Sequence, residues 1–394
     1  MLQIPENRDF VFIDDAHTFG GTQIALAWVI RVVLQKTQAS VLCICSQRTW
    51  EAVVGVVGNT PRLSFEEAPS ALSLNLLRFP IRLPAWWFLL RRVRKEGDRI
   101  WWLNLADIEF CLAPLLVLCL IGEFPHSYLH GTSPFAFFHR EAPIGRRLLS
   151  RFRDGLANRF VFRLHSLLVT PSIASLDEVK HRIRSTRQPR FGYLYYAPIG
   201  ENANLLTAPI SVEPPPSALP ISIWMIGNVV QGHKNNLAAL DLLQSLDRMG
   251  IDANLTIAGV GPDLAAFQTE AKRRNLSERI RYLGWVANPC DTAPKDAIVF
   301  IPSFHETMNI VAREAMRNGL RLVASPIKIF HEWIPQLLIA SSFAPDAFAS
   351  KLVEVYRMDA SVLGALYGNA LARFSNEIFV ENLLRYSGIT WHTA

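Results

Sequence analysis

Residues 297–325 read AIVFIPSFHETMNIVAREAMRNGLRLVAS, and this stretch decides the fold of the chain around it. The apolar run Ala297–Ile301 predicts a buried strand, and a second run at Leu320–Ala324 predicts another. The residues between them predict a helix that stops at Gly319. A strand, a helix and a second strand form a βαβ unit, and ligands bind such units at the carboxyl ends of the strands.

Two glutamates lie at the carboxyl end of the first predicted strand and in the helix that follows it. They are Glu306 and Glu314, with seven residues between them. Backbone N–H groups and the helix dipole at a helix start favour a phosphate. A carboxylate on each side of a phosphate site indicates a ligand with phosphates and hydroxyls, such as a nucleotide sugar. The alternative is an ordinary amphipathic helix with two solvated glutamates.

This spacing, followed by Ala315-Met316 and Gly319 before an apolar strand, resembles the donor-site signature of retaining GT-B glycosyltransferases, family 4 in particular. The resemblance implies an α/β protein with two Rossmann-like domains that face a central cleft. It implies that Glu306 holds hydroxyls of the transferred sugar and that Glu314 holds the ribose of the nucleotide. The family is metal-independent, so we expect no metal ion and no cofactor.

The stretch Gly227–Asn235 resembles the family's phosphate-binding motif, in which an arginine and a lysine stand between a strand and a helix. Lys234 matches the lysine, which neutralises the donor diphosphate and helps the nucleotide depart. Asn228 takes the place of the arginine, and an amide brings no positive charge to a phosphate. We place Lys234 near a helix start, where the dipole disfavours cations, so an anion is expected beside it.

The resemblance assigns further donor-binding residues in the second half of the chain. Gly259 belongs to a Gly-rich loop after the next strand, and main-chain groups near Val286 border the nucleotide base. Thr307, Met308 and Asn309 follow Glu306, and their backbone N–H groups are expected to face the phosphate.

In the first half the resemblance rests on two loops. Gly20 and Gly21 match a Gly-rich loop that faces the donor phosphates and the acceptor, although no third glycine completes a dinucleotide fingerprint. A plain strand–helix turn is the alternative. His130 follows a predicted strand and matches a histidine that contacts the transferred sugar, which makes it a catalytic-site residue together with Lys234 and Glu306. The alternative is a packed histidine at the end of a strand.

The pattern along the chain predicts two α/β domains with mostly parallel sheets, because short apolar runs alternate with helical segments on both sides of a proline-rich stretch. A length of 394 residues, half of them hydrophobic, suffices for two cores. We expect an acceptor-binding domain at 1–197, a linker at 198–220, a nucleotide-sugar-binding domain at 221–375, and at 376–394 a helix that crosses back to the first domain. The expected strands are 10–13, 41–45, one beginning at 101, 127–129, 166–170, 221–226, 254–258 and 280–283, and the expected helices are 22–35, 146–164, 235–249, 263–275 and 376–388. Ser172 is a candidate N-cap.

The net charge of +6 is unevenly distributed. Residues 1–200 contain 24 Lys and Arg against 16 Asp and Glu, a balance of +8, whereas residues 201–394 contain 16 against 18, a balance of −2. The two halves therefore suit different partners. No nucleic-acid recognition motif is visible, so we expect an anionic membrane surface or a phosphate-bearing acceptor beside the basic half and no nucleic acid.

Residues 79–102 combine tryptophans with basic side chains, a composition that suits an interface with anionic lipid. They comprise Trp86, Trp87, Trp101, Trp102, Arg82, Arg91, Arg92, Arg94 and Lys95. The Arg-rich segment 146–163 can extend this surface. The alternative is one buried helix with a solvated basic face.

The five cysteines show no paired Cys-x-x-Cys spacing, which indicates free thiols in a reducing compartment and no metal site. The N-terminus shows no signal-peptide pattern, and the most apolar stretch, Phe110–Gly122, is too short to span a bilayer. We expect a cytoplasmic protein that can bind peripherally to the inner face of the membrane.

These observations predict a retaining hexosyltransferase of polysaccharide biosynthesis. It would move a mannose- or glucose-type hexose from a GDP- or UDP-sugar to a lipid-linked saccharide or a cell-envelope glycan, by orientation and leaving-group stabilisation. Two alternatives remain open at the level of sequence. One is a nucleotide-sugar epimerase on the same fold, and the other is an inactive glycosyltransferase-like partner subunit, which Asn228 favours.

Overall fold

The computed structural model describes residues 9–15, 21–69, 79–97, 99–105, 112–129, 144–183, 189–195, 210–214, 220–374 and 376–387. The chain divides into two compact units. Unit 1 contains Met1–Glu201 and the C-terminal segment Phe374–Ala394, and unit 2 contains Asn202–Arg373. The boundary after Glu201 falls within the proline-rich stretch 198–220.

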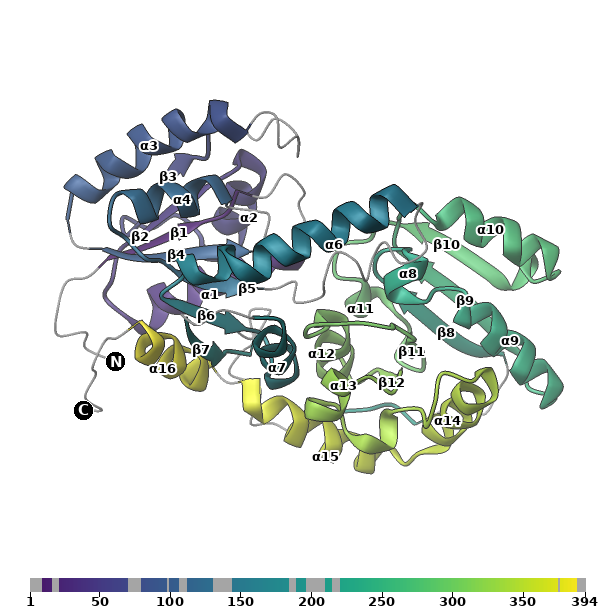
Figure 1. Cartoon of the computed structure of the whole chain (residues 1–394). Coiled ribbons are helices and arrows are strands. Elements are labelled where there is room, and N and C mark those ends of the chain that lie inside the picture. The colour runs from purple at the N-terminus through teal and green to yellow at the C-terminus, as the bar shows by residue number, and fades with distance from the viewer. Residues whose placement is uncertain are drawn as a thin grey trace. The chain divides into compact units, whose positions relative to one another are not determined.

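Unit 1 is built on a seven-stranded parallel sheet with the strand order β3-β2-β1-β4-β5-β6-β7 (Figure 1). The strands are β1 (Asp9–Ile13), β2 (Val41–Cys45), β3 (Leu63–Glu67), β4 (Arg99–Leu105), β5 (His126–Leu129), β6 (Leu167–Thr170) and β7 (Arg190–Tyr193). The helices are α1 (Gly21–Lys36), α2 (Gln47–Val57), α3 (Phe79–Lys95), α4 (Leu112–Leu120), α6 (Ile144–Arg159), α7 (Ile173–Arg182) and α16 (Asn376–Tyr386).

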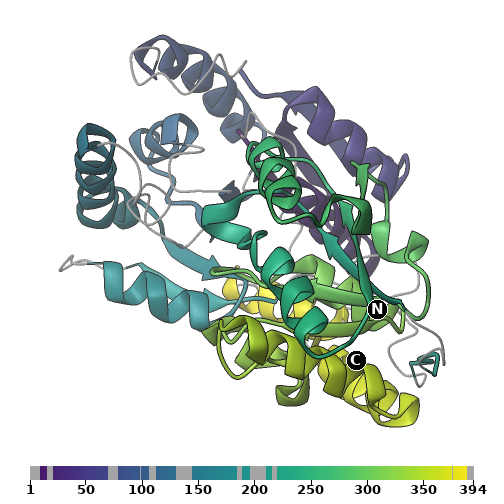
Figure 2. The ribbon, with the colours of Figure 1, turned by 90° about the vertical axis from the view of Figure 1, so that its right-hand side faces the viewer.

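Unit 2 is built on a five-stranded parallel sheet with the order β10-β9-β8-β11-β12. The strands are β8 (Ile221–Ile226), β9 (Ala253–Ala258), β10 (Ile280–Gly284), β11 (Ile298–Ile301) and β12 (Arg321–Ala324). The helices are α8 (Gln231–Lys234), α9 (Ala238–Arg248), α10 (Leu264–Arg273), α11 (Pro289–Thr292), α12 (Ile310–Arg317), α13 (Lys328–Trp333), α14 (Pro345–Arg357) and α15 (Ala360–Leu371). They flank the sheet in the views of Figures 1 and 2.

Both sheets reverse direction at the same place in their strand order. In each unit the first strand lies inside the sheet, the next two strands extend to one side of it, and the fourth strand returns to its other side. The reversal therefore lies between β1 and β4 in unit 1 and between β8 and β11 in unit 2. In open α/β sheets, ligands bind outside the carboxyl ends of the strands at this point.

Most predicted elements are confirmed. The strands predicted at 41–45 and 221–226 coincide with β2 and β8. Ser172 is the N-cap of α7, and its hydroxyl accepts a hydrogen bond from the Ser175 backbone N–H at 3.1 Å. Gly319 ends the α12 region with φ 69°, and a Cβ there would lie 2.0 Å from the Ser211 carbonyl oxygen, so only glycine fits.

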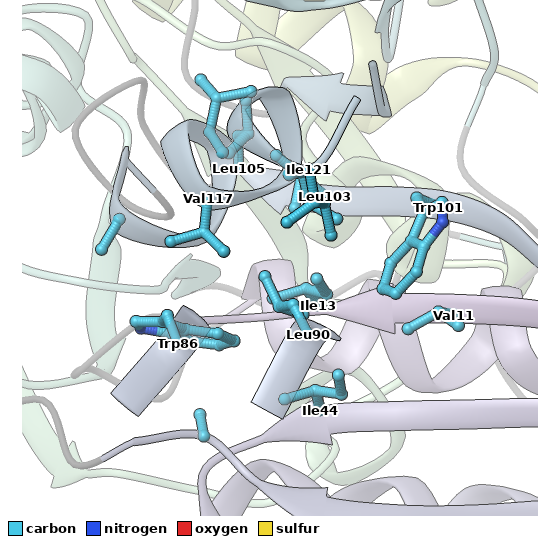
Figure 3. Packing of buried hydrophobic residues seen from close by; sticks show 14 of the residues in the cluster. Val11, Ile13, Ile44, Trp86, Leu90, Trp101, Leu103, Leu105, Val117 and Ile121 are labelled. Atoms are coloured by element: carbon cyan, nitrogen blue, oxygen red, sulfur yellow. The ribbon is translucent and has the colours of Figure 1, made fainter. Parts of the chain in front are cut away.

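The tryptophans of the 79–102 segment are mostly core residues, so the predicted interfacial aromatic surface is wrong in this respect. Trp86, Trp101 and Trp102 have exposed fractions of 0%, 5% and 2%. Trp86 and Trp101 pack with β1, β2 and α4 in the hydrophobic cluster of Figure 3. The reason is that successive residues of the central strand β4 point to opposite faces of a sheet that is covered on both sides.

Trp102 points to the other face, where the C-terminal segment covers the sheet. Its indole Nε1 donates a hydrogen bond to Ser387 Oγ at 3.2 Å. Phe379 and Leu383 of α16 line a small apolar cavity with Trp102 and residues of α1. The last helix therefore completes the core of unit 1.

We predict that Leu383→Ala, which truncates a side chain with 1% exposure, destabilises unit 1 by about 2–5 kcal/mol, because it removes buried methyl groups and leaves a cavity. The measurement is denaturant unfolding followed by fluorescence. Ile378→Ala on the same helix is the control, because that side chain is 44% exposed. Equal losses for the two variants would contradict the packing of α16 described above.

Candidate functional site

A charged pair spans the strand reversal of unit 2. Lys234 is the last residue of the short helix α8, which follows β8, and Glu306 lies in the loop after β11. The ammonium Nζ of Lys234 donates a hydrogen bond to Glu306 Oε1 at 2.6 Å. The glutamate is buried and the lysine half-buried, and both follow strands at the reversal, where the topology predicts a ligand.

Three donors hold the Glu306 carboxylate in one orientation. Besides Lys234, the Ser303 hydroxyl donates at 2.7 Å and the Asn309 side-chain amide donates at 2.9 Å, and both bonds end on Oε1. Within the described part of the chain, no hydrogen bond to Oε2 is found. Because a carboxylate offers about four lone-pair sites, Oε2 remains able to accept hydrogen bonds from a ligand hydroxyl.

The charges of this site are set by its burial and its neighbours. Burial alone would raise the pKa of Glu306, but Lys234, His233 and the Ser303 hydrogen bond outweigh it and keep the pKa below its ordinary value. Burial, together with the charge of the adjacent Lys234, lowers the pKa of His233 to about 4. At neutral pH the site therefore holds a carboxylate, an ammonium and a neutral imidazole.

The helix expected at 235–249 begins later than predicted, and this changes the position of Lys234. Gln231–Lys234 form the separate turn α8, which ends at Asn235 with φ 54°, and α9 begins at Ala238. Lys234 therefore lies at the end of a helical turn, where a cation is favourable, and not near a helix start. The predicted anion beside Lys234 is present, because Glu306 contacts it. The reason given for that prediction was wrong, since the helix dipole favours a cation at this position.

Asn309 has a structural role that the sequence analysis missed. It is the N-cap of α12, with φ 63°, and its Oδ1 accepts a hydrogen bond from the Ala312 backbone N–H at 2.8 Å. The signal was available, because asparagine is a preferred N-cap residue and tolerates this conformation. One side chain thus fixes both the helix start and the Glu306 carboxylate. Met308 is fully buried, and its predicted contact with the donor stays a prediction.

The glycine loop after β9 packs against the loop after β8. A Cβ at Gly259 would lie 1.9 Å from the Gly227 carbonyl oxygen, and one at Gly261 would lie 2.2 Å from the Val229 carbonyl oxygen. The Asp263 carboxylate also accepts a hydrogen bond from the Gln231 backbone N–H at 2.7 Å. These contacts explain the glycines by chain packing, and donor binding by Gly259 stays a prediction.

Glu314 lies in the second turn of α12 and is half-buried. Burial raises the pKa of its carboxyl to about 7, although the charge of Arg313 acts to lower that pKa. Perturbed carboxyl groups of this kind cluster at functional sites. The carboxyl is thus part-protonated near neutral pH and can both donate a hydrogen bond to a ligand and accept one.

The other predicted residues are placed as follows. Asn228 is exposed, Val286 is half-buried and Thr307 is half-buried, each after the carboxyl end of a unit 2 strand. Gly21 is the first residue of α1. Gly20 and His130 lie outside the described residues, so their predicted roles are not examined by the geometry.

Two features of the described residues concern metals and membranes. Among them, no group of three or more His, Cys, Asp and Glu side chains is arranged to hold a metal ion. None of the helices traced between residues 9 and 387 is both long enough and apolar enough to cross a bilayer. Metal-independence stays a prediction.

A family model described as glycosyl transferases group 1 matches residues 220–358, which lie within unit 2. The putative glycosyltransferase EpsF of Bacillus subtilis (strain 168) is 30% identical over 103 residues. That match covers 26% of this chain and 27% of EpsF, so the chain spans about a quarter of that relative's length.

Two solved structures are similar over nearly the whole chain. HepE of Anabaena, in complex with UDP and glucose, has a TM-score of 0.69 and 14% identity. The match covers 97% of this chain and 100% of HepE. The apo form of the lipopolysaccharide outer core galactosyltransferase WaaB has a TM-score of 0.65 and 16% identity, with 96% of this chain and 98% of that chain covered. These likenesses show that the fold is GT-B.

We predict that Glu314→Gln raises the Tm of the ligand-free protein above about pH 7. Each 1 kcal/mol gained in the free energy of unfolding corresponds to a rise in Tm of roughly 2–4 °C. Because the folded-state pKa lies above the ordinary value of 4.5, the folded protein binds more protons, and stability falls as pH rises from 4.5 to about 7. The substitution removes that loss, so the two melting curves should converge below pH 4.5. Thermal unfolding against pH is the measurement.

The control is Glu278→Gln, which changes an exposed carboxylate of the same unit and should shift stability by less than about 0.5 kcal/mol. A lower Tm for Glu314→Gln at high pH would show that the charged carboxylate is stabilised in the folded state.

Proposed function

We propose that this chain, whose fold is GT-B, is a glycosyltransferase that moves a hexose from a nucleotide diphosphate sugar to a hydroxyl of a glycan acceptor. The observation that carries the proposal is the Lys234–Glu306 pair across the strand reversal of unit 2. A fixed carboxylate beside an ammonium group suits a ligand that carries hydroxyls next to negative charge. A nucleotide diphosphate sugar has this combination.

Lys234 supplies positive charge to the leaving group. An ammonium has three N–H donors, and one of them is engaged by Glu306, so two remain for phosphate oxygens. As the bond between the sugar and the diphosphate breaks, negative charge grows on the bridging phosphate oxygen. An ammonium already fixed in the crevice stabilises that charge without reorganisation.

Glu306 and Glu314 recognise the two ends of the donor in this proposal. Oε2 of Glu306 accepts hydrogen bonds from the transferred hexose, because Oε1 is saturated by its three donors. Glu314 binds the ribose hydroxyls. Backbone N–H groups at Thr307, Met308 and the start of α12 add donors for the phosphates.

We further propose that the configuration at the anomeric carbon is retained. In a same-face attack the acceptor oxygen bonds to the anomeric carbon, the bond from that carbon to the diphosphate breaks, and the hydroxyl proton passes to the departing phosphate. No protein nucleophile is required, and Lys234 supplies charge stabilisation without a metal ion. NMR of the new anomeric centre tests this step.

For the donor we favour a UDP-hexose over a GDP-hexose, because HepE was solved with UDP and glucose and WaaB is named a galactosyltransferase. For the acceptor we favour a lipid-linked saccharide or a cell-envelope glycan in polysaccharide biosynthesis, because WaaB acts on the lipopolysaccharide outer core by its name. A partner-subunit role without activity stays the alternative, since Asn228 is neutral where the resembled family has an arginine.

We also propose that unit 1 binds an anionic membrane surface from the cytoplasmic side, through helix α6. Its residues Ile144, Leu148 and Phe152 recur every four positions and are 59–69% exposed, and Arg151 and Arg159 of the same helix are exposed. An exposed apolar stripe beside basic side chains suits the lipid interface. On α3, by contrast, Arg92 and Arg94 are engaged by Glu66 and Glu123, so that helix contributes less than its sequence predicts.

We predict that UDP-glucose raises the Tm of the protein, because a ligand stabilises the state that binds it. Lys234→Met should weaken UDP-glucose binding by roughly 10–100-fold, which corresponds to the loss of about 1.5–3 kcal/mol for a charged hydrogen bond. Isothermal titration is the measurement. Lys272→Met is the matched control, because Lys272 is an exposed lysine on α10.

Turnover separates the proposed transferase from its alternatives. UDP release that depends on an added glycan supports transfer, whereas conversion of the sugar nucleotide without acceptor would support an epimerase. Glu306→Ala should abolish transfer whether the donor is a UDP-hexose or a GDP-hexose. UDP-sugar binding without turnover by the unaltered protein, alone and with a glycan panel, would favour the partner-subunit role.

We predict that Leu148→Glu combined with Phe152→Glu lowers binding to vesicles containing phosphatidylglycerol by roughly tenfold or more, because it removes apolar side chains and adds like charge at the lipid surface. Vesicle flotation is the measurement, and Ile378→Glu on α16 is the control. Unchanged flotation of the double variant would refute the role of α6.

A further inference from the structure

Three consecutive residues of unit 2 contact the loop on the other side of the strand reversal. The His233 carbonyl oxygen accepts a hydrogen bond from the Phe304 backbone N–H at 2.9 Å. The Asn235 side-chain Nδ2 donates to the Pro302 carbonyl oxygen at 3.1 Å. Lys234 stands between these two residues in the chain, and its ammonium contacts the same loop. The lysine is therefore flanked by two hydrogen bonds that join the same pair of segments.

The two flanking hydrogen bonds differ in what the sequence must supply. The bond between His233 and Phe304 joins backbone groups, so it depends on neither side chain. The bond from Asn235 to Pro302 requires a side-chain donor at residue 235. Asn235 is 7% exposed and Pro302 is buried, so loss of the donor takes this partner from a buried carbonyl oxygen. The Asn235 side chain is thus the part of the junction that the sequence specifies.

Backbone conformation alone does not explain the asparagine. Asn235 ends α8 with φ 54°, in the left-handed region that glycine adopts most easily. Asparagine tolerates this region, and its Oδ1 lies 3.3 Å from the side-chain Nε2 of Gln231. Gln231 is fixed in turn, because its Oε1 accepts a hydrogen bond from the Leu237 backbone N–H at 2.8 Å. A glycine at residue 235 would satisfy the backbone and lose the contacts of the side chain.

The position of the Lys234 backbone matters for the proposed chemistry. An ammonium stabilises a departing diphosphate without reorganisation only if it is in place before the negative charge develops. A misplacement of about 1 Å can lower a rate by about 100-fold. Because Asn235 adjoins Lys234 in the chain, its bond to Pro302 limits how far the lysine backbone can move from the loop that carries Glu306.

We propose that Asn235 is a positioning residue of the donor site. Its side chain holds the α8 turn against the loop after β11, so that the Lys234 ammonium is in place before a donor diphosphate binds. The inference rests on the proposed function and adds to it a residue that acts through Lys234. Asn235 takes no part in bond making or proton transfer.

The test is a double-mutant cycle on the full-length protein with UDP-glucose. Asn235→Gly retains the backbone conformation and removes the hydrogen bond to Pro302. It should raise the Kd for UDP-glucose by about fivefold in the otherwise unaltered protein. In the Lys234→Met protein the same substitution should change the Kd by less than about twofold, because residues that act through one another are not additive. Isothermal titration is the measurement, with saturation-transfer NMR for the weaker variants.

Asn275→Gly is the matched control. Asn275 has the same residue type and nearly the same backbone conformation, with φ 57°, but it is exposed and follows α10. Both substitutions introduce the conformational freedom of glycine, so the control measures that effect alone. We expect the Asn275→Gly protein to bind UDP-glucose within about twofold of the unaltered protein.

Several outcomes would overturn the assignment. An equal rise in Kd with and without the Lys234→Met substitution would show that Asn235 acts on the fold in general. A rise for Asn275→Gly as large as that for Asn235→Gly would show the same. If Asn235→Gly leaves the Kd unchanged while Lys234→Met weakens binding, the inference falls and the proposed function stands. If the unaltered protein does not bind UDP-glucose, the proposed function fails and the inference fails with it.

Discussion

The reversal of strand order is the constraint on which the candidate site depends. Where crossovers leave a sheet in opposite directions, the loops after the two neighbouring strands separate, and side chains from both can meet at the carboxyl edge. In unit 2 this brings together Lys234 and Glu306, which are 72 residues apart in the chain. Replacing a buried ion pair by apolar residues is often neutral or stabilising, whereas removing one partner costs about 3–5 kcal/mol. The pair is therefore poorly explained by stability and well explained by ligand binding.

The two reversals carry different chemistry, although the topology around them is the same. In unit 2 an ammonium accompanies the carboxylate, whereas in unit 1 Asp14 is held by the neutral amides of Gln23 and Asn104, and the Arg82 guanidinium lies 3.8 Å from Asp15. This contrast runs against the overall charge, because residues 1–200 are basic and residues 201–394 are slightly acidic. Part of the basic charge of the first half lies away from the strand reversal, at exposed arginines of α6.

The sequence predicted the fold well, because periodicity, the proline-rich stretch and the turn glycines are local signals. It located β2, β8 and the Glu306 loop without reference to distant contacts. It failed where long-range contacts decide. The tryptophans of β4 and α3 resembled interfacial residues until both faces of the sheet were seen to be covered. It also missed that Asn309 and Ser303 fix Glu306, and it gave Asp14 no role, because its partners Gln23 and Asn104 are identified only through the strand order.

Three carboxyl groups share a property that packing does not require. Asp15 and Glu314 each have a pKa raised to about 7 by burial, and Glu306 keeps its charge only because Lys234 and polar neighbours surround it. In the ligand-free protein the first two reduce stability at neutral pH, and a sequence selected for stability alone would replace them. Local rules are broken in this way chiefly at functional sites. In the proposed function, hydroxyls of the donor bind at Glu306 and Glu314, and this is the physical reason for placing the donor in unit 2.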